Sequence, residues 1–597
     1  MGLRLARKPF SSRALLALPL LILGAADCYS TGDGTPPPLD QLYYPVGLQV
    51  SAGGSVLYAV NSDFDLQYNG GTLQSYDLGL IRQHAVKLIA DPSAREIPLV
   101  DESRRYTGDD CREGSARLTT LGETCAPPVK SDFYVRDSAV IGAFATDLLL
   151  SRPPASLESS TLPDPSTPAN DAGNRAFDRL FMAVRGNASV TWASVERDTV
   201  GAVLPSDPKT YGPFRFRCGQ DSEGRCDGNH QAGSNPDEPG NTRHITMPGE
   251  PFGMAMSQDG RAIVITHQNE TKTSLFDTGL RRTDGTGPGN PPSRDDDARK
   301  PSLQFVLEQV PIGGVAVAAI PHDRDAFVDR TSPYPQAFLE TSRAAPQVSL
   351  LRQYPDELPD VNSKQRTESN QLRPFLDLEG GYGVVVGPGG TDSRGIVIDP
   401  TPRLACKAKV KKNLGLTKAE SAAQILACAR KPARVFIANR TPASMLIGEL
   451  GGSTTAENNF DPDRLLLHAT IPLSAGPSKL YLAPVVEADG ALALRVFAVC
   501  FDSATIFVYN PDTEQVENVI RTGLGPFAMA FDPFSFEDVA ENNIVESADG
   551  IRRYRFGYLA SFTNSFIQVL DLDNGGRSPT FERVVFTLGQ PTNPKGS

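Results

Sequence analysis

Hydrophobic residues in this chain recur in short runs, each followed by a polar loop and a second run of alternating apolar residues. Runs this short with a period of two predict β-strands joined as hairpins rather than helices. Seven copies of the first run align without internal gaps: Leu57 to Asn61, Leu180 to Val184, Ile263 to His267, Ala337 to Thr341, Val435 to Asn439, Val496 to Cys500 and Gly557 to Ser561. The second column of this alignment is always a large β-former: Tyr58, Phe181, Val264, Phe338, Phe436, Phe497 and Tyr558.

Another short segment precedes most of these runs and has a small residue near its start. The small residues are Gly47, Gly253, Gly395 and Ala528. Strands that surround a central channel crowd together there, and one hydrogen or one methyl group suits that position. We therefore predict an all-β, seven-bladed β-propeller with long loop insertions. Arg583 to Leu588 is predicted as the last outer strand, so that each blade is built from contiguous chain.

The repeat can also be compared with known families. The order Pro-x-Gly/Ala-apolar, a chain reversal, apolar-Tyr/Phe-x-Val/Ala-Asn and a Val-x-Val-x-Asp-like strand resembles the YVTN-type β-propeller repeat, with Asn61 and Asn439 at its Asn position. Val184, His267, Thr341, Cys500 and Ser561 occupy that position elsewhere. The resemblance covers residues 43 to 590 and implies the fold. Proteins of this type include envelope proteins of unknown role, and they resemble lactonase-type sugar enzymes.

The N-terminal segment predicts export. Basic residues up to Arg13 precede the apolar run Ala14 to Leu23, which is too short to span a bilayer. Gly24-Ala25-Ala26 suits an ordinary signal peptidase, whereas Cys28 stands where a bacterial lipoprotein carries its diacylated cysteine, although Asp27 departs from the lipobox. We predict a signal peptide at 1–28 with Cys28 as the candidate lipid anchor, or else a soluble periplasmic protein. A linker at 29–42, a propeller at 43–590 and a tail at 591–597 follow, with blades starting near 43, 140, 250, 312, 392, 476 and 525.

The cysteines fit an oxidising compartment. Three sequence-local pairs are predicted to form disulfides, Cys111 with Cys125, Cys218 with Cys226 and Cys406 with Cys428. Cys500 lies in an apolar run and is expected to be a buried thiol. No metal site is expected, because no CxxC occurs and the six histidines lack ligand spacing.

Composition narrows the function classes. The chain has 597 residues with 53 Gly and 49 Pro, which indicate many turns. A net charge of -12, without a long Lys/Arg run, argues against a nucleic-acid partner. Equivalent strands are unevenly spaced, so the excess residues, including Pro153 to Pro168 and Arg281 to Arg299, must form loop insertions. In one insertion Thr417 and Glu420 form a capping box that predicts one short helix over Ala422 to Arg430.

Two residues depart from the repeat pattern. His267 stands where other copies have Asn, Thr or Ser, and it either takes part in a site or hydrogen-bonds a loop backbone as Asn would. Glu340 stands in a column of apolar and small residues, which places a carboxylate between blades. A buried acid needs a partner or a raised pKa. Alternatively, blade four is out of register by one residue.

Two cations lie near the start of innermost strands. Arg394 and Lys479 could both point into the channel mouth and bind an anion. Alternatively they pair with nearby acids such as Asp392 or Asp502.

No catalytic motif, P-loop, dinucleotide turn or haem site occurs, and no cofactor is expected. We therefore predict a monomeric, envelope-anchored, non-enzymatic binding or scaffold module, which presents its loop insertions to a protein or glycan partner. The alternative is a lactonase-like or other small-molecule hydrolase that uses Arg394, Lys479, His267 and Glu340 at the channel.

Overall fold

The computed structural model describes residues 34–91, 94, 96–100, 128–151, 177–198, 212–238, 241, 243–279, 300–327, 336–354, 374–384, 391–452, 460–544 and 551–589. Several predictions lie outside these residues. They are the signal peptide with Cys28, the Cys111 and Cys125 pair, the C-terminal tail, and the insertions at residues 153–168 and 281–299.

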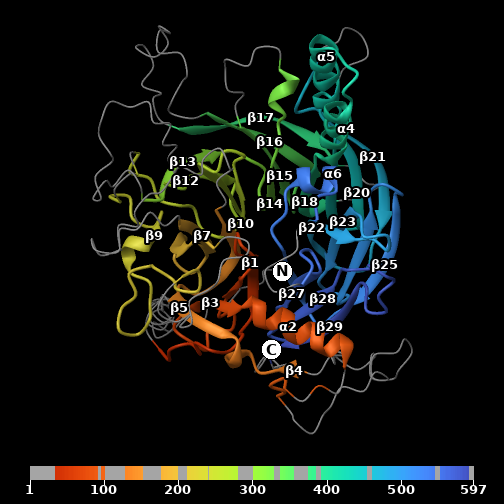
Figure 1. Cartoon of the computed structure of the whole chain (residues 1–597). Coiled ribbons are helices and arrows are strands. Elements are labelled where there is room, and N and C mark those ends of the chain that lie inside the picture. Colours follow the sequence, from red (N-terminus) through yellow and green to blue (C-terminus); the bar gives the residue numbers. More distant parts are fainter. Residues whose placement is uncertain are drawn as a thin grey trace, which may run out of the picture.

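Seven antiparallel sheets stand around a common axis (Figure 1). The seven-bladed propeller is thereby confirmed, and the four main strands of each blade are consecutive in the chain. From the innermost strand outward, blade one consists of β1 (Pro45–Val50), β2 (Val56–Asn61), β3 (Gly71–Asp77) and β5 (Val135–Ile141), and blade two of β6 (Ala145–Leu150), β7 (Phe177–Val184), β8 (Ser189–Glu196) and β9 (Gln231–Ala232). Blade three consists of β10 (Pro251–Met256), β11 (Ala262–His267), β12 (Lys272–Asp277) and β13 (Ser302–Glu308). Blade four consists of β14 (Gly314–Ala319), β15 (Gln336–Ser342), β16 (Gln347–Tyr354) and β17 (Phe375–Gly383).

The remaining blades follow the same order. They are β18 (Thr391–Asp399), β19 (Ala433–Thr441), β20 (Ala443–Leu450) and β21 (Leu465–Pro472); β22 (Pro477–Val486), β23 (Leu492–Cys500), β24 (Thr505–Asn510) and β25 (Gln515–Arg521); β26 (Pro526–Phe531), β27 (Phe556–Ser561), β28 (Phe566–Asp571) and β29 (Arg583–Leu588). In the described part of the chain the helices are α2 (Leu78–Ala90), α4 (Thr401–Lys412), α5 (Lys418–Ala429) and α6 (Phe536–Glu541), with single 3-10 turns at Ser131–Phe133, Gly228–His230 and Arg324–Ala326.

The core lies between neighbouring blades. Each predicted first run became the second strand of a blade, and β2, β11 and β27 are buried at every position. Tyr58 of blade one and Met182 of blade two, for example, share one hydrophobic cluster. Close packing of alternate residues from adjacent sheets explains why the repeat needs a large β-former here.

The small residues of the innermost strands are required by contact with the next blade. A Cβ atom on Gly47 would lie 2.5 Å from the Cβ of Leu148 in β6, and one on Gly253 would lie 2.2 Å from the carbonyl oxygen of Val315 in β14. Contacts this short are not tolerated, so only glycine fits at these two positions. The predicted crowding at the channel is confirmed.

A fifth strand joins the last blade to the first. Strand β4 (Pro128–Val129) belongs to the connection between β3 and β5 of blade one, and it pairs in parallel with β29 of blade seven. The backbone N–H of Gly589 also donates to the carbonyl of Val129, at 2.9 Å. In the described residues the four main strands of each blade come from contiguous chain, while β4 adds a strand from blade one to the sheet of blade seven and holds the two ends of the ring together.

One prediction about local structure is wrong, and one of the two alternatives left open for blade four is confirmed. The insertion in blade five carries a pair of helices, not one. The capping box at Thr417 and Glu420 begins α5 as predicted, but α4, with a proline in its first turn, was missed. Blade four is indeed shifted by one residue, since Ser342, and not Thr341, pairs with the first residue of the innermost strand as His267 does in blade three.

Candidate functional site

The up-and-down order of strands divides the connections between two faces. Connections from first to second and from third to fourth strands leave one face, which carries α2, α4, α5, α6 and almost all long connections. We call it the insertion face. Connections from second to third strands, and between blades, leave the opposite face and are short, apart from residues 233–250. We call this the short-loop face.

An ion pair spans the central channel. One column of the innermost strands, which follows a bulge, holds the small residues Gly47, Gly253, Ala316, Gly395 and Ala528 in five blades. In blades two and six the same column holds Asp147 and Lys479. Lys479 Nζ lies 3.2 Å from Asp147 Oδ1. Because β6 and β22 are not neighbours in the ring, the two side chains meet across the channel.

The surroundings of this pair stabilise both charges. Asp147 also accepts a hydrogen bond from the backbone N–H of Met254, at 3.2 Å, and Lys479 Nζ lies 4.6 Å from the centre of the Phe527 ring. Burial lowers the pKa of Lys479, but the charge of Asp147 and its hydrogen bond outweigh this and the net pKa is raised. Lys479 is therefore charged at neutral pH and held in place.

Arg394 does not join Lys479. It lies one residue before Gly395, within the bulge, and its guanidinium pairs with Asp392 of the same strand. Asp502, the other acid considered, pairs with Arg440 at 2.7 Å. Both cations thus have carboxylate partners, but the partner of Lys479 was not among those predicted because it lies 332 residues away.

His267 has the structural role that Asn61 has in blade one. Its Nδ1 lies 2.8 Å from the carbonyl of Gly249, in the loop that enters the blade, and its Nε2 lies 2.8 Å from the hydroxyl of Ser274 on the third strand. Asn61 makes the same link in blade one, from the N–H of Tyr43 to the third strand. Burial lowers the pKa of His267 to about 4, so the ring is neutral.

Glu340 is buried between blades three and four. Its Oε2 accepts a hydrogen bond from the Thr273 hydroxyl, at 2.7 Å, and burial raises the pKa of Glu340 to about 8. With the register corrected, Glu340 lies level with Ile265 of blade three and not with Thr266. It remains a carboxyl group in an apolar column, protonated at neutral pH.

The four candidate residues therefore do not form one site. Each has its own partners, and no hydrogen bond or ion pair among the described residues joins any two of them. In the described residues, no group of three or more His, Cys, Asp and Glu side chains is arranged to hold a metal ion.

An aromatic cluster on the short-loop face was missed by the sequence analysis. Phe562, directly after the second strand of blade seven, lies 4.9 Å from Tyr44, 5.3 Å from Phe64 and 5.9 Å from Phe527, measured between ring centres. Phe64 is 50% exposed. Since Phe527 also lies against Lys479, the cluster extends from the surface to the ion pair in the channel.

Arginines occupy the same position as Phe562 in other blades. One position beyond the column of Asn61 and His267, blades two, four and five have Arg185, Arg343 and Arg440, and blades six and seven have Phe501 and Phe562. Arg185 pairs with Glu250, Arg343 donates to Asn269 at 2.7 Å, and Arg440 pairs with Asp502. Extending the repeat alignment by one residue would have revealed this column in blades two, five, six and seven, whereas Arg343 joins it only after the register of blade four is corrected.

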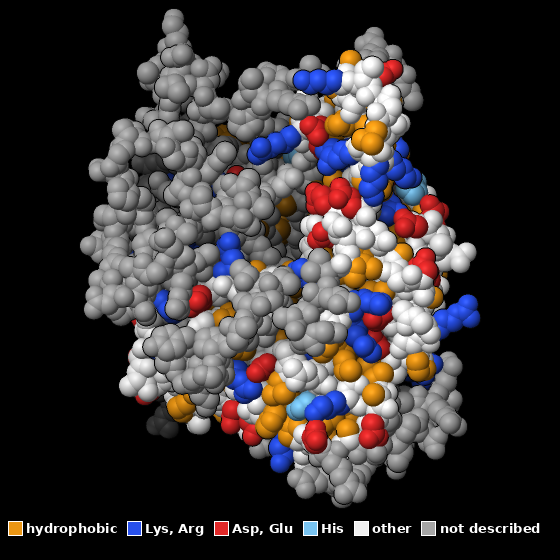
Figure 2. Space-filling view, in the orientation of Figure 1, with side chains coloured by type: hydrophobic (Ala, Val, Ile, Leu, Met, Phe, Trp, Pro, Cys, Tyr) orange, Lys and Arg blue, Asp and Glu red, His pale blue; other side chains and the backbone are white. Residues whose placement is uncertain are grey.

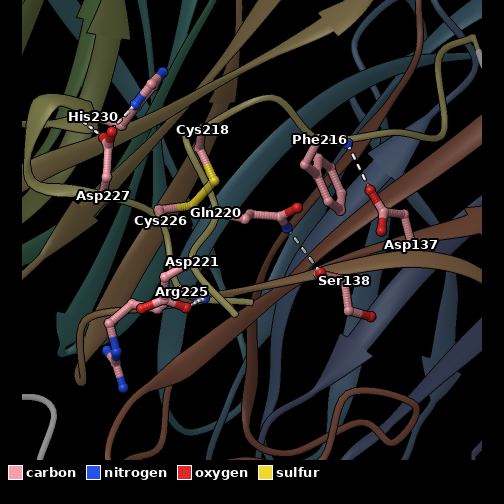
Figure 3. The surroundings of a disulfide bond; sticks show 10 residues. All are labelled: Asp137, Ser138, Phe216, Cys218, Gln220, Asp221, Arg225, Cys226, Asp227 and His230. Atoms are coloured by element: carbon pink, nitrogen blue, oxygen red, sulfur yellow. Dashed lines mark hydrogen bonds and ion pairs between the residues drawn. A yellow bond between two sulfur atoms is a disulfide. The ribbon is translucent and has the colours of Figure 1, made fainter. Parts of the chain in front are cut away.

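Two of the predicted disulfides are formed. Cys406 joins Cys428 between α4 and α5, and Cys218 joins Cys226 in the connection between β8 and β9. The second loop lies against the outer strand of blade one (Figure 3), where Gln220 donates to the carbonyl of Ser138, at 3.1 Å, and Cys226 N–H to that of Val140. Cys500 is a buried thiol, and burial raises its pKa to about 12. The disulfides indicate an oxidising compartment.

No helix in the described part of the chain is both long and apolar enough to cross a bilayer.

Comparison with known proteins does not assign the chain to a family. No family model and no curated protein matches the chain. Matching solved structures include the periplasmic gluconolactonase of Pseudomonas aeruginosa (13% identity, TM-score 0.32, covering 70% of this chain and 84% of that one) and the hydrazine synthase of Kuenenia stuttgartiensis (10%, 0.36, 91% and 99%). A protein from Lactobacillus plantarum matches at 9% identity and TM-score 0.35, over 81% of this chain and 86% of that one. Similarity this distant carries no functional argument, and the fold rests on the seven sheets themselves.

Proposed function

We propose that this protein is a non-enzymatic binding module of the cell envelope that binds a glycan at the aromatic cluster of the short-loop face. The observation that carries the proposal is Phe562, a central ring in contact with Tyr44, Phe64, Phe501 and Phe527 beside the channel mouth. Sugar rings have an apolar face of C–H groups that stacks on aromatic side chains, while their hydroxyl groups need polar partners. Ligand sites in general combine an apolar lining with a few fixed polar groups.

The polar partners lie around the same mouth. Arg185 with Glu250 and Arg440 with Asp502 present paired charges on the rim, and Lys479 with Asp147 lies in the channel. Carboxylates and guanidinium groups already fixed by one partner can accept and donate further hydrogen bonds without reordering. This arrangement supports binding of a hydroxyl-rich ligand. The short loops of this face leave the channel mouth accessible to such a ligand.

The envelope location rests on two features. The Cys218 to Cys226 and Cys406 to Cys428 disulfides support an oxidising compartment, and the N-terminal segment supports export. Attachment through Cys28 would be tested by mass spectrometry of the mature N-terminus. A diacylated Cys28 is the expected result. A mature chain that begins at Asp27 with an unmodified cysteine would show that the exported protein is soluble and not lipid-anchored.

The lactonase-like or other small-molecule hydrolase is the alternative. A hydrolase needs a base or nucleophile within reach of the bound substrate, with a pKa suited to proton transfer. His267 and Glu340 are buried and engaged in the blades, and Lys479 is held by Asp147. We therefore favour binding without turnover.

Matched phenylalanine variants test the proposal. The full mature chain is titrated by calorimetry against chito-oligosaccharides, uronic-acid oligomers and gluco-oligomers. Phe64→Ala and Phe562→Ala are expected to weaken binding about tenfold or more. Phe133→Ala is the control, because Phe133 is 48% exposed, as Phe64 is 50% exposed, but lies on the insertion face. Equal affinity of all variants, or no binding to any glycan, would reject the site. Lactone hydrolysis that Lys479→Ala abolishes would favour the hydrolase.

A further inference from the structure

The helical pair α4 and α5 has a charge opposite to that of the protein. Between residues 401 and 431 the chain carries Arg403, Lys407, Lys409, Lys411, Lys412, Lys418, Arg430 and Lys431, and Glu420 is the one acid of this segment. The whole chain has a net charge of -12. A cationic segment in an acidic protein is a local electrostatic feature that favours anionic partners.

Three of these cations hold the pair against the propeller. Arg403 is buried and donates to the carbonyls of Pro321, Lys431 and Leu450, while Lys407 pairs with Asp323 at 3.0 Å and Asp325 at 2.7 Å. Arg430 donates to the carbonyl of Ala326. Together with the Cys406 to Cys428 disulfide, these contacts fix the helical pair relative to the blades.

The other five cations face outward. They are Lys409, Lys411, Lys412, Lys418 and Lys431, all exposed and without an ion pair to any described residue. Ion pairing with the described residues therefore does not account for them. Figure 2 shows Lys and Arg side chains around the α4 and α5 pair, which projects from the ring of blades in Figure 1.

The tip of the pair carries one highly exposed apolar side chain. Leu414, in the turn between α4 and α5, is 96% exposed, the highest value among the exposed large hydrophobic residues of the described chain. Lys411, Lys412 and Lys418 flank it. Burial of a leucine this exposed would be favourable, and lysines beside it suit a surface that offers both anionic groups and an apolar layer.

A cavity of about 390 Å³ lies between the two helices. Its walls combine the apolar residues Pro402, Ala405, Val410 and Ala427 with the side chains of Lys409 and Lys431. Apolar walls next to two ammonium groups suit an amphiphile, which carries a negative headgroup on an apolar chain. An acidic protein surface would use the lysines but has no need of this cavity or of Leu414.

We propose that the α4 and α5 pair docks onto a bilayer that exposes anionic headgroups, with Leu414 entering the interface and the five exposed lysines contacting phosphates. Each lysine near an anionic surface contributes on the order of 1 kcal/mol of attraction, so five lysines and one leucine make a weak, salt-sensitive contact on their own. Because the pair projects from the insertion face, docking leaves the short-loop face free to bind its ligand. The inference is independent of the proposed glycan site.

Vesicle flotation tests the inference. The full chain is used with Cys28→Ala, so that no acyl chain contributes, and is mixed with vesicles of phosphatidylcholine alone or with phosphatidylglycerol. Binding is expected to the mixed vesicles only and to decline as salt is raised. Lys411→Glu with Lys412→Glu is expected to weaken binding roughly tenfold or more. Leu414→Ser is expected to weaken it at every salt concentration.

The control variant reverses the same number of charges elsewhere. Lys130→Glu with Arg521→Glu alters two exposed cations outside the helical pair and is expected to leave vesicle binding unchanged. Circular dichroism checks that each variant is folded. Equal loss of binding in both double variants would show a general charge effect and overturn the inference. Binding to polyglutamate but not to vesicles would indicate that the partner of the helical pair is an acidic protein. If inorganic phosphate alone competes with vesicle binding, the cavity is a simple anion site and not a site for an amphiphile.

Discussion

Lys479 in the innermost strand of blade six and Asp147 in that of blade two lie 3.2 Å apart, although their strands are separated by β1 and β26. Both residues occupy the column in which the other blades have Gly or Ala. Two opposite charges therefore stand where the other blades have small residues, and each side chain has the other as its ion-pair partner. The pair connects strands that no backbone hydrogen bond joins.

A double-mutant cycle should reveal this dependence. Asp147→Asn or Lys479→Met leaves one charge in the channel without its partner, and we expect each to lower the free energy of unfolding by about 1–3 kcal/mol. The expected loss is smaller than for a fully buried pair, because the side chains are 20% and 23% exposed. The combined variant should lose less than the sum of the two, as measured by urea denaturation. Strictly additive losses would mean that the pair does not couple.

Glu340 should make the protein less stable at high pH. The pKa of Glu340 is about 8 in the folded chain against an ordinary value of 4.5, so between these values the folded state keeps a proton that the unfolded state loses. The free energy of unfolding therefore falls as pH rises through this window. Glu340→Gln keeps a hydrogen-bonding group for Thr273 but does not titrate. Between pH 5 and pH 9 the free energy of unfolding of this variant should therefore rise by about 2–4 kcal/mol relative to that of the native protein.

Thermal unfolding at several pH values measures this difference. Glu449→Gln is the control, because the Glu449 side chain is exposed to solvent on β20. If the two glutamine variants follow the same pH profile, Glu340 is not the titrating group.

His267 should make the protein less stable at low pH. The ring is neutral in the folded protein with a pKa of about 4, against an ordinary value of 6.5. Below pH 6.5 the unfolded state binds a proton that the folded state does not bind, so the free energy of unfolding decreases as pH falls from 6.5 to 4. His267→Asn copies Asn61 of blade one and should reduce this acid sensitivity. Unchanged acid unfolding midpoints in that variant would contradict the assignment.

The repeat predicted the strands well because their burial depends on local pattern. The runs that contain Tyr58, Phe181 and Tyr558 form second strands with residues that are fully buried between blades, and such positions demand large apolar side chains. Arg583 to Leu588 likewise forms the last outer strand with the predicted bounds.

What the pattern could not predict depends on contacts between distant residues. Lys479 finds Asp147 only when blades two and six face each other across the channel, and the sequence offers closer acids. Phe562 becomes part of a cluster only beside Tyr44 and Phe64, which belong to the other end of the chain. The register of blade four could not be fixed because Ala337 to Ser342 permits two alignments, and only the pairing of Gly314 with Ser342 decides between them.

The Cys406 to Cys428 disulfide should stabilise the helical pair and not the ring. It closes a loop of 22 residues, which corresponds to about 3 kcal/mol of loop entropy. Cys406→Ala with Cys428→Ala should therefore raise hydrogen exchange in α4 and α5 while leaving exchange in β19 and β20 unchanged. Removing the Cys218 to Cys226 disulfide serves as the control, since that loop packs on blade one. Increased exchange throughout blade five would show that the helical pair supports the blade itself.

Strand β4 should close the ring. Val129 is fully buried, pairs with Leu588 of the last blade and accepts the N–H of Gly589. Without this strand, blades one and seven are held together by the contacts of their innermost strands and the core between them. Val129→Asp places a charge in that core and should cost at least about 3 kcal/mol, whereas Val129→Ala should cost about 2 kcal/mol.

Hydrogen exchange distinguishes closure of the ring from a local effect. In both Val129 variants the amides of β29 should lose protection before those of β10 to β17, because opening begins where the ends of the chain meet. Val516→Ala is the control, since Val516 is 36% exposed on the outer strand of blade six and should be nearly neutral. If β29 keeps its protection while only residues near β4 exchange faster, then β4 lies on the last blade without holding it, and the core between blades one and seven alone keeps the ring closed.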